Sequence, residues 1–63
     1  MGQQFTWTHR ATDRYLAIGR LVDGKRFRIE SANPYNVLYR NYYDARVYLL
    51  RDGKRILVQR STP

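Results

Sequence analysis

The sequence predicts a small α+β domain in which an antiparallel sheet of two β-hairpins is covered on one face by a single helix. Two Asp-Gly pairs between strand-like segments predict the hairpins, and an Asn-Pro pair followed by apolar residues at helical spacing predicts the helix. The expected order is ββαββ, preceded in one alternative by a fifth, N-terminal strand. We expect residues 1–63 to form one domain, because a chain of this length builds one small core.

The hairpins are predicted by an internal repeat. Residues 21–26 read LVDGKR and residues 50–55 read LRDGKR, and apolar residues alternate after each copy. Asp-Gly favours two-residue turns of type I′, which require positive φ angles. We therefore expect hairpins at residues 14–31 and 45–60.

Two-residue loops would set the register of both hairpins. They place Ile18 opposite Ile29, Leu49 opposite Ile56 and Val47 opposite Val58. A three-residue loop with a glycine bulge would slip the first hairpin by one residue. It would set Phe27 opposite Gly19 and mix the faces, because a slip of one residue moves side chains across the sheet. We favour the two-residue loops.

The helix is predicted over residues 33–43. Asn33 suits an N-cap and Pro34 suits the first helical position. The apolar face of this helix would rest on the hairpins. Tyrosine and valine are mediocre helix formers, so Asn-Pro opening a turn is the alternative. The predicted apolar stripe consists of Tyr35, Leu38, Tyr39 and Tyr42.

Residues 1–13 are ambiguous. Phe5, Trp7 and His9 alternate with threonines, which is the period of a strand. The segment is therefore an edge strand, an arm that pairs with a second copy in a homodimer, or a partly ordered tail.

Charge indicates the class of partner. Twelve lysines and arginines, ten of them arginines, stand against five acidic residues, which gives a formal net charge of +7. A chain this basic favours a polyanion, either nucleic acid or the acidic surface of a protein. Arginine in particular binds phosphates and guanine edges with two parallel hydrogen bonds.

Composition excludes several other classes. The chain has no cysteine and one histidine, so we expect no disulfide, metal site or cofactor. No apolar run is long enough for a membrane span or a signal peptide, which predicts a cytoplasmic protein without a membrane partner.

The predicted binding site is the sheet face that points away from the helix. Cations interleaved with aromatic rings suit nucleic acid, because guanidinium groups neutralise phosphates while rings stack on bases. Lysines at the two hairpin tips would add steering charge. The candidate residues are Arg26, Arg28, Arg46 and Arg55, with Tyr15 and Tyr48 for stacking and Lys25 and Lys54 at the tips.

The function expected from this pattern is a non-enzymatic, regulatory or accessory nucleic-acid-binding protein. The alternative is a small interaction or inhibitor protein that docks on an acidic surface of a larger complex, since arginine and tyrosine also dominate protein interfaces. A third reading is an RNA-cleaving toxin. That reading would use His9, Arg10, Arg14 and Tyr15, but the sequence shows no catalytic motif, and we expect no catalytic residue.

Overall fold

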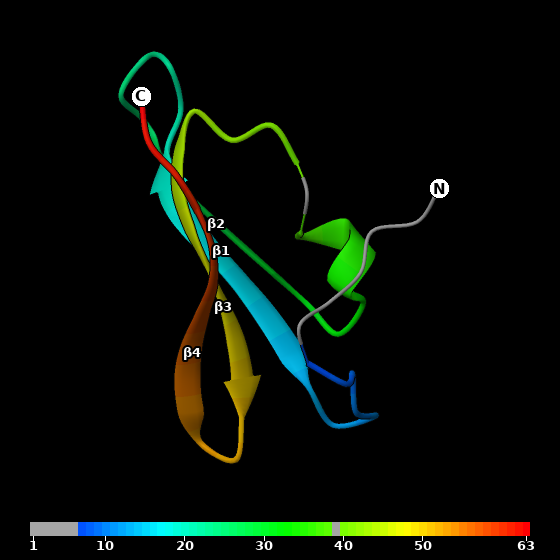
Figure 1. The fold of residues 1–63 in the computed structure, drawn as a ribbon. Helices are drawn as coiled ribbons and strands as arrows, with labels where there is room; N and C mark the ends of the chain where they lie inside the picture. Colours follow the sequence, from blue (N-terminus) through cyan, green and yellow to red (C-terminus); the bar gives the residue numbers. More distant parts are fainter. Residues whose placement is uncertain (1–6, 39) are drawn as a thin grey trace.

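Four antiparallel strands in the order β2-β1-β3-β4 make up the sheet of the computed structural model, which describes residues 7–38 and 40–63 (Figure 1). Both predicted hairpins are present, and their tips lie at opposite ends of the sheet. The strands are β1 (Arg14–Arg20), β2 (Arg26–Ser31), β3 (Asp44–Arg51) and β4 (Lys54–Ser61).

The predicted helix over residues 33–43, and with it the α+β class, is wrong. The described residues contain a single 3-10 turn, η1 (Pro34–Asn36), and no α-helix covers the sheet. Asn33 does cap this turn, since its Oδ1 accepts a hydrogen bond from the Tyr35 amide at 3.0 Å. The turn ends at Val37, whose φ of −125° lies outside the helical range.

The topology explains why a helix does not form there. Because β2 and β3 are both antiparallel to β1, the chain between them must return along the length of the sheet. A helix over residues 33–43 would advance only about 16 Å, at about 1.5 Å per residue. The eight residues of β3 extend about 26 Å, at about 3.3 Å per residue. The crossover instead consists of bends, a short 3-10 turn and, from residue 40, irregular chain, and it passes over one face of the sheet (Figure 1).

The face under the crossover holds the core. Val37 and Leu38 of the crossover pack against buried side chains of the two central strands, Tyr15, Ala17, Val47 and Leu49. Half-buried side chains surround this cluster; they are Trp7, Phe27, Ile29, Tyr42 and Val58. We call this side of the sheet the core face.

Only some of the tyrosines in the predicted apolar stripe belong to this core. Tyr42 stacks on Phe27 with ring centroids 5.5 Å apart, and its hydroxyl donates a 2.6 Å hydrogen bond to the Val37 carbonyl. Burial raises the pKa of the Tyr42 hydroxyl. Tyr35 is 66% exposed and does not belong to the core. Tyr39 lies outside the described residues.

The register predicted for the first hairpin is also wrong. Five residues, 21–25, connect β1 to β2, and Phe27 lies opposite Gly19 as in the slipped register. The connection is closed by hydrogen bonds from the Leu21 amide to the Lys25 carbonyl at 2.8 Å and from the Gly24 amide to the Leu21 carbonyl at 2.9 Å. This register directs Phe27 to the core face, where it contacts Tyr42.

The second hairpin has the predicted two-residue turn. Asp52 and Gly53 adopt φ angles of 52° and 72°, and Leu49 lies opposite Ile56. The predicted pairing of Val47 with Val58 is wrong, because a β-bulge shifts the register between Val47 and Tyr48. Val47 lies opposite Gln59 instead.

The N-terminal segment is no edge strand within the described residues. Residues 7–13 form a bend and a turn that lead into β1, and Trp7 packs against the core. Phe5, the other aromatic residue of the predicted arm, lies outside the described residues. A membrane-crossing helix is not found among residues 7–38 and 40–63.

Candidate nucleic-acid interface

The sheet face opposite the core is dominated by arginine. Directly paired residues of antiparallel strands project to the same face, so the register assigns each side chain to a side. All seven arginines on this side are exposed, and the carboxylates that accompany them belong to Glu30 and Asp44. The face is defined by Arg14, Arg20, Arg26, Arg28, Arg46, Arg55 and Arg60, and we call it the arginine face.

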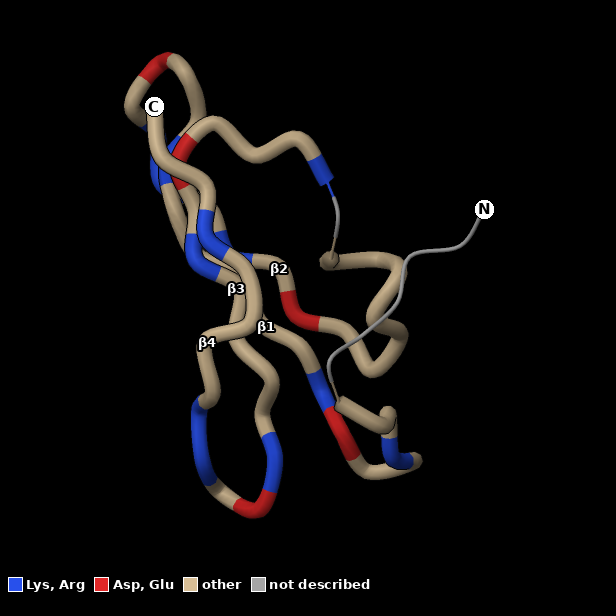
Figure 2. Tube along the Cα trace, viewed as in Figure 1, with Lys and Arg blue, Asp and Glu red and all other residues tan. Residues whose placement is uncertain are grey.

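Pairing across the strands orders these side chains into rows. The first row is Arg26-Arg20-Asp44, the second is Arg28-Ile18-Arg46-Arg60, and the third is Glu30-Leu16-Tyr48-Leu57. Figure 2 shows basic positions of neighbouring strands gathered near the C-terminal end of β4, and a further group around the β3–β4 tip.

Two of the cross-strand pairs join arginine to arginine. Arg20 lies directly opposite Arg26, and Arg46 lies directly opposite Arg60. Like charges in such positions destabilise a sheet by roughly 0.2–1 kcal/mol per pair. The fold gains nothing from either pair, so an anion held between the guanidinium groups would relieve a repulsion that the free protein contains.

The acidic residues of the face compensate only part of this charge. Glu30 accepts hydrogen bonds from Arg14 Nε at 2.9 Å and from Arg28 Nη2 at 3.0 Å. The bond from Arg14, with a smaller contribution from Arg28, lowers the pKa of the Glu30 carboxyl. The other four arginines of the first two rows make no ion pair with a described carboxylate.

A hollow lies between the first and second rows. Its lining includes the acidic Asp44 and Gly19 of the intervening row, together with four arginines, Arg20, Arg26, Arg46 and Arg60. The lining omits the next core-face row of Ile29, Ala17 and Val47, which places the hollow on the arginine face. Four arginines and one aspartate therefore line one concave site.

The backbones are unusually close beneath this hollow. A Cβ atom at Gly19 would clash with the Asp44 carbonyl oxygen and would lie 2.7 Å from Ala45 Cα. The floor of the hollow therefore requires glycine at position 19.

The third row adds apolar surface beside the cations. Leu57 is 49% exposed, and Tyr48 is half-buried with the Arg55 guanidinium 5.4 Å from its ring centroid. Leu16, in the same row, is almost completely buried.

The structure brings together five of the eight predicted site residues. Arg26, Arg28, Arg46, Arg55 and Tyr48 share the arginine face. The hairpin-tip lysines Lys25 and Lys54 are exposed at opposite ends of the sheet.

Tyr15 does not join them. Its side chain is fully buried on the core face, so it offers no stacking surface. The reason is the slipped register, which turns the odd-numbered residues of β1 inward.

Two arginines of the hollow escaped the sequence-based prediction. Arg20 reaches this face because the first hairpin has a five-residue connection. Arg60 reaches it because the bulge shifts the alternation of β4. Gln59 pairs with Val47 on the core face, and Arg60 therefore pairs with Arg46 on the arginine face. Neither the loop length nor the bulge has a marker in the local sequence.

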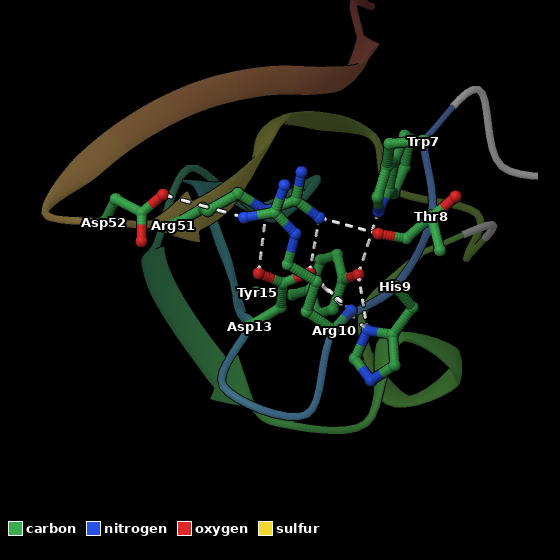
Figure 3. A network of polar contacts seen from close by, with 8 residues as sticks. All are labelled: Trp7, Thr8, His9, Arg10, Asp13, Tyr15, Arg51 and Asp52. Atoms are coloured by element: carbon green, nitrogen blue, oxygen red, sulfur yellow. Dashed lines mark hydrogen bonds and ion pairs between the residues drawn. The ribbon is translucent and has the colours of Figure 1, made fainter.

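A polar network at the other end of the core explains the burial of Tyr15 (Figure 3). Its hydroxyl accepts a 3.0 Å hydrogen bond from Trp7 Nε1 and lies 2.9 Å from His9 Nδ1. Nearby, the buried carboxylate of Asp13 accepts two bonds from Arg51 and one from the Arg10 amide. Arg51 also donates to the Thr8 carbonyl at 2.7 Å.

This network attaches the N-terminal segment to the sheet. The hydrogen bonds from Arg51 hold the pKa of the Asp13 carboxyl well below its usual range, and the same bonds raise the pKa of the Arg51 guanidinium. The described residues contain no group of three histidine, cysteine or acidic side chains that could hold a metal ion.

The residues of the toxin hypothesis are not assembled into one site. His9 contacts Tyr15, but Arg14 projects from the opposite face and pairs with Glu30. Arg10 approaches Asp52 at 3.7 Å.

Comparison with protein-family models, with curated proteins and with solved structures finds no match for this chain.

Proposed function

We propose that this chain is a non-enzymatic, regulatory or accessory protein of the cytoplasm that binds nucleic acid through the arginine face. The supporting observation is the pairing of arginine with arginine across neighbouring strands, Arg20 with Arg26 and Arg46 with Arg60. Bound phosphates convert these repulsions into attractions, and each neutralised phosphate releases counterions.

Salt dependence of binding tests this proposal. The double variant Arg46→Gln/Arg60→Gln removes one arginine pair, and Arg10→Gln/Arg40→Gln removes the same net charge from outside the face. The affinity for an oligonucleotide is measured at several salt concentrations. The slope of log affinity against log salt is negative, and we expect its magnitude to decrease by about 1.4–1.8 for the first variant, if both arginines contact phosphates, and to change much less for the second.

Stability provides the control for this experiment. Because Arg46 and Arg60 repel each other in the free protein, their replacement by glutamine leaves the melting temperature unchanged or raises it. Equal affinity and equal slope in both double variants would contradict the proposal.

The second candidate is a protein that docks on an acidic protein surface. The exposed Leu57 within the arginine face favours it, because protein interfaces combine apolar contacts with arginine and tyrosine. A Leu57→Ser substitution separates the two functions: it weakens docking to a protein surface strongly and changes the salt slope for nucleic acid very little.

A further inference from the structure

We infer that the arginine face binds a single strand of nucleic acid, with phosphates in the hollow and a base stacked on the Arg55 guanidinium that lies over Tyr48. This inference rests on the proposed function and specifies the form of the nucleic acid. It follows from the width of the face, from the chemistry of the hairpin tips and from the order of the rows.

The width of the face argues against insertion into the major groove of duplex DNA. The second row spans four strands, and three strand spacings of about 4.8 Å give about 14 Å before side chains are counted. The major groove is about 12 Å wide and admits a helix or a two-stranded ribbon. A four-stranded face cannot enter it.

The hairpin tips are poor candidates for a ribbon inserted into the groove. At the β3–β4 tip, Arg51 is held by Asp13, and Asp52 offsets the charge of the exposed Lys54. At the β1–β2 tip, Asp23 offsets Lys25, and the exposed Leu21 and Val22 are apolar. The excess positive charge lies on the strands, where a flexible single strand can follow it.

The order of the rows matches the two parts of a nucleotide. The hollow between the first two rows is lined by four arginines against one aspartate, and the adjacent third row presents Tyr48 and Leu57. Neighbouring rows are about 6.6 Å apart, since two residues along a strand separate them. A backbone in the hollow therefore places its bases over the third row.

Arg55 completes the stacking position. Its guanidinium lies over the Tyr48 ring at 5.4 Å, and guanidinium planes stack on bases as aromatic rings do. The unstacked bases of a single strand can reach this pair, whereas the bases of a duplex are enclosed between its strands.

Three probes of equal length test the inference. They are a 12-residue oligothymidylate, a 12-base-pair duplex and a 12-residue abasic strand, each fluorescently labelled and titrated at one salt concentration. Small single-strand-binding domains contact about 4–16 nucleotides, so about 12 residues is long enough to fill the site. We expect the oligothymidylate to bind at least about tenfold more tightly than the abasic strand, and more tightly than the duplex, because base stacking is available only to the first probe.

Variants of Tyr48 assign the stacking position. Tyr48→Ala weakens oligothymidylate binding by roughly five- to a hundred-fold and leaves the abasic strand within about twofold. Tyr48→Phe keeps the ring under Arg55 and retains binding. Tyr35→Ala, which removes an exposed tyrosine of the crossover, is the matched control without effect. Melting temperatures confirm that each variant is folded.

The outcomes separate the two proposals. If the duplex binds as tightly as the single strand, or if Tyr48→Ala weakens both single strands equally, the inference is wrong while nucleic-acid binding stands. If none of the three probes binds, the proposed function itself is wrong.

Discussion

Arg51 holds both carboxylate oxygens of Asp13, although 38 residues separate them in the chain. Nε lies 2.9 Å from Oδ1, and Nη2 lies 2.7 Å from Oδ2. The carboxylate is fully buried and the guanidinium is 16% exposed. The pair joins the last residue of β3 to the turn that precedes β1, and Arg51 extends the contact to Thr8. It therefore closes the end of the core at which Trp7 packs.

Removal of this carboxylate charge is predicted to destabilise the fold. In Asp13→Asn, the amide cannot replace both charge-assisted bonds, and the Arg51 guanidinium loses its counter-ion in a largely buried place. We expect the melting temperature to fall by about 5–15 °C. Asp23→Asn is the control, because that exposed turn residue keeps its bond to the Lys25 amide. Equal melting temperatures in the two variants would contradict the assigned role.

The same pair predicts acid sensitivity. The pKa of the Asp13 carboxyl is lower in the folded than in the unfolded chain, so the unfolded chain binds protons first as the pH falls. The stabilisation is complete above about pH 5, declines below about pH 4 and disappears once the folded carboxyl is protonated. The pKa of Glu30 is also lowered in the folded chain, so Glu30 contributes to stability in the same direction, but solvent weakens this contribution on the exposed face. Melting curves between about pH 2 and pH 7 should show the parent and Asp13→Asn converging at acid pH. A difference in melting temperature between the two proteins that does not change with pH would contradict this predicted acid sensitivity.

Gly19 is predicted to be the glycine least tolerant of substitution among those the structure describes. In Gly19→Ala, the new methyl group meets the Asp44 carbonyl and Ala45 Cα, so β1 and β3 must separate at the floor of the hollow. Gly24→Ala is the comparison: it has open space but a φ of 89°, which costs about 1–2 kcal/mol. Denaturant unfolding should show a larger loss of stability for Gly19→Ala. The reverse order would mean that the close approach of the strands is not maintained in solution.

The two Asp-Gly turns show how far the sequence predicts this fold. Asp52-Gly53 forms the predicted two-residue turn, whereas Asp23-Gly24, within a nearly identical hexapeptide, lies in a five-residue connection. The two hexapeptides differ at one position, Val22 against Arg51, and share the Asp-Gly pair, so tertiary packing decides the loop length. In the first hairpin, the slipped register brings Phe27 over Gly19 and onto Tyr42, and this burial outweighs the turn preference.

The arginine face was predictable in part for the same reason. Strand alternation, which is a local property, predicts correctly that Arg28, Arg46 and Tyr48 lie on this face. Arg60 depends on a bulge in β4, and the partnership of Asp13 with Arg51 depends on contacts between distant segments. The helix prediction was wrong because the crossover must span the length of the sheet. This requirement comes from the strand order, and the spacing of apolar residues within 33–43 carries no information about it.

Tyr15 is predicted to act through its hydroxyl in the network rather than as a stacking ring. Trp7 Nε1 can only donate, so the hydroxyl oxygen accepts from it and can offer its own proton to His9 Nδ1. Tyr15→Phe keeps the buried ring but leaves both partners without the hydroxyl. We expect the free energy of unfolding to fall by about 1–3 kcal/mol.

Fluorescence gives this prediction a second, local measurement. Trp7 is the only tryptophan in the chain, so its emission reports directly on the lost hydrogen bond. In Tyr15→Phe, the emission of the folded protein should shift, because the indole N–H must find another partner. Tyr43→Phe removes a hydroxyl from an exposed tyrosine and should change neither emission nor stability. An unchanged emission in Tyr15→Phe, with stability equal to that of Tyr43→Phe, would show that the hydroxyl does not hold the N-terminal segment on the core.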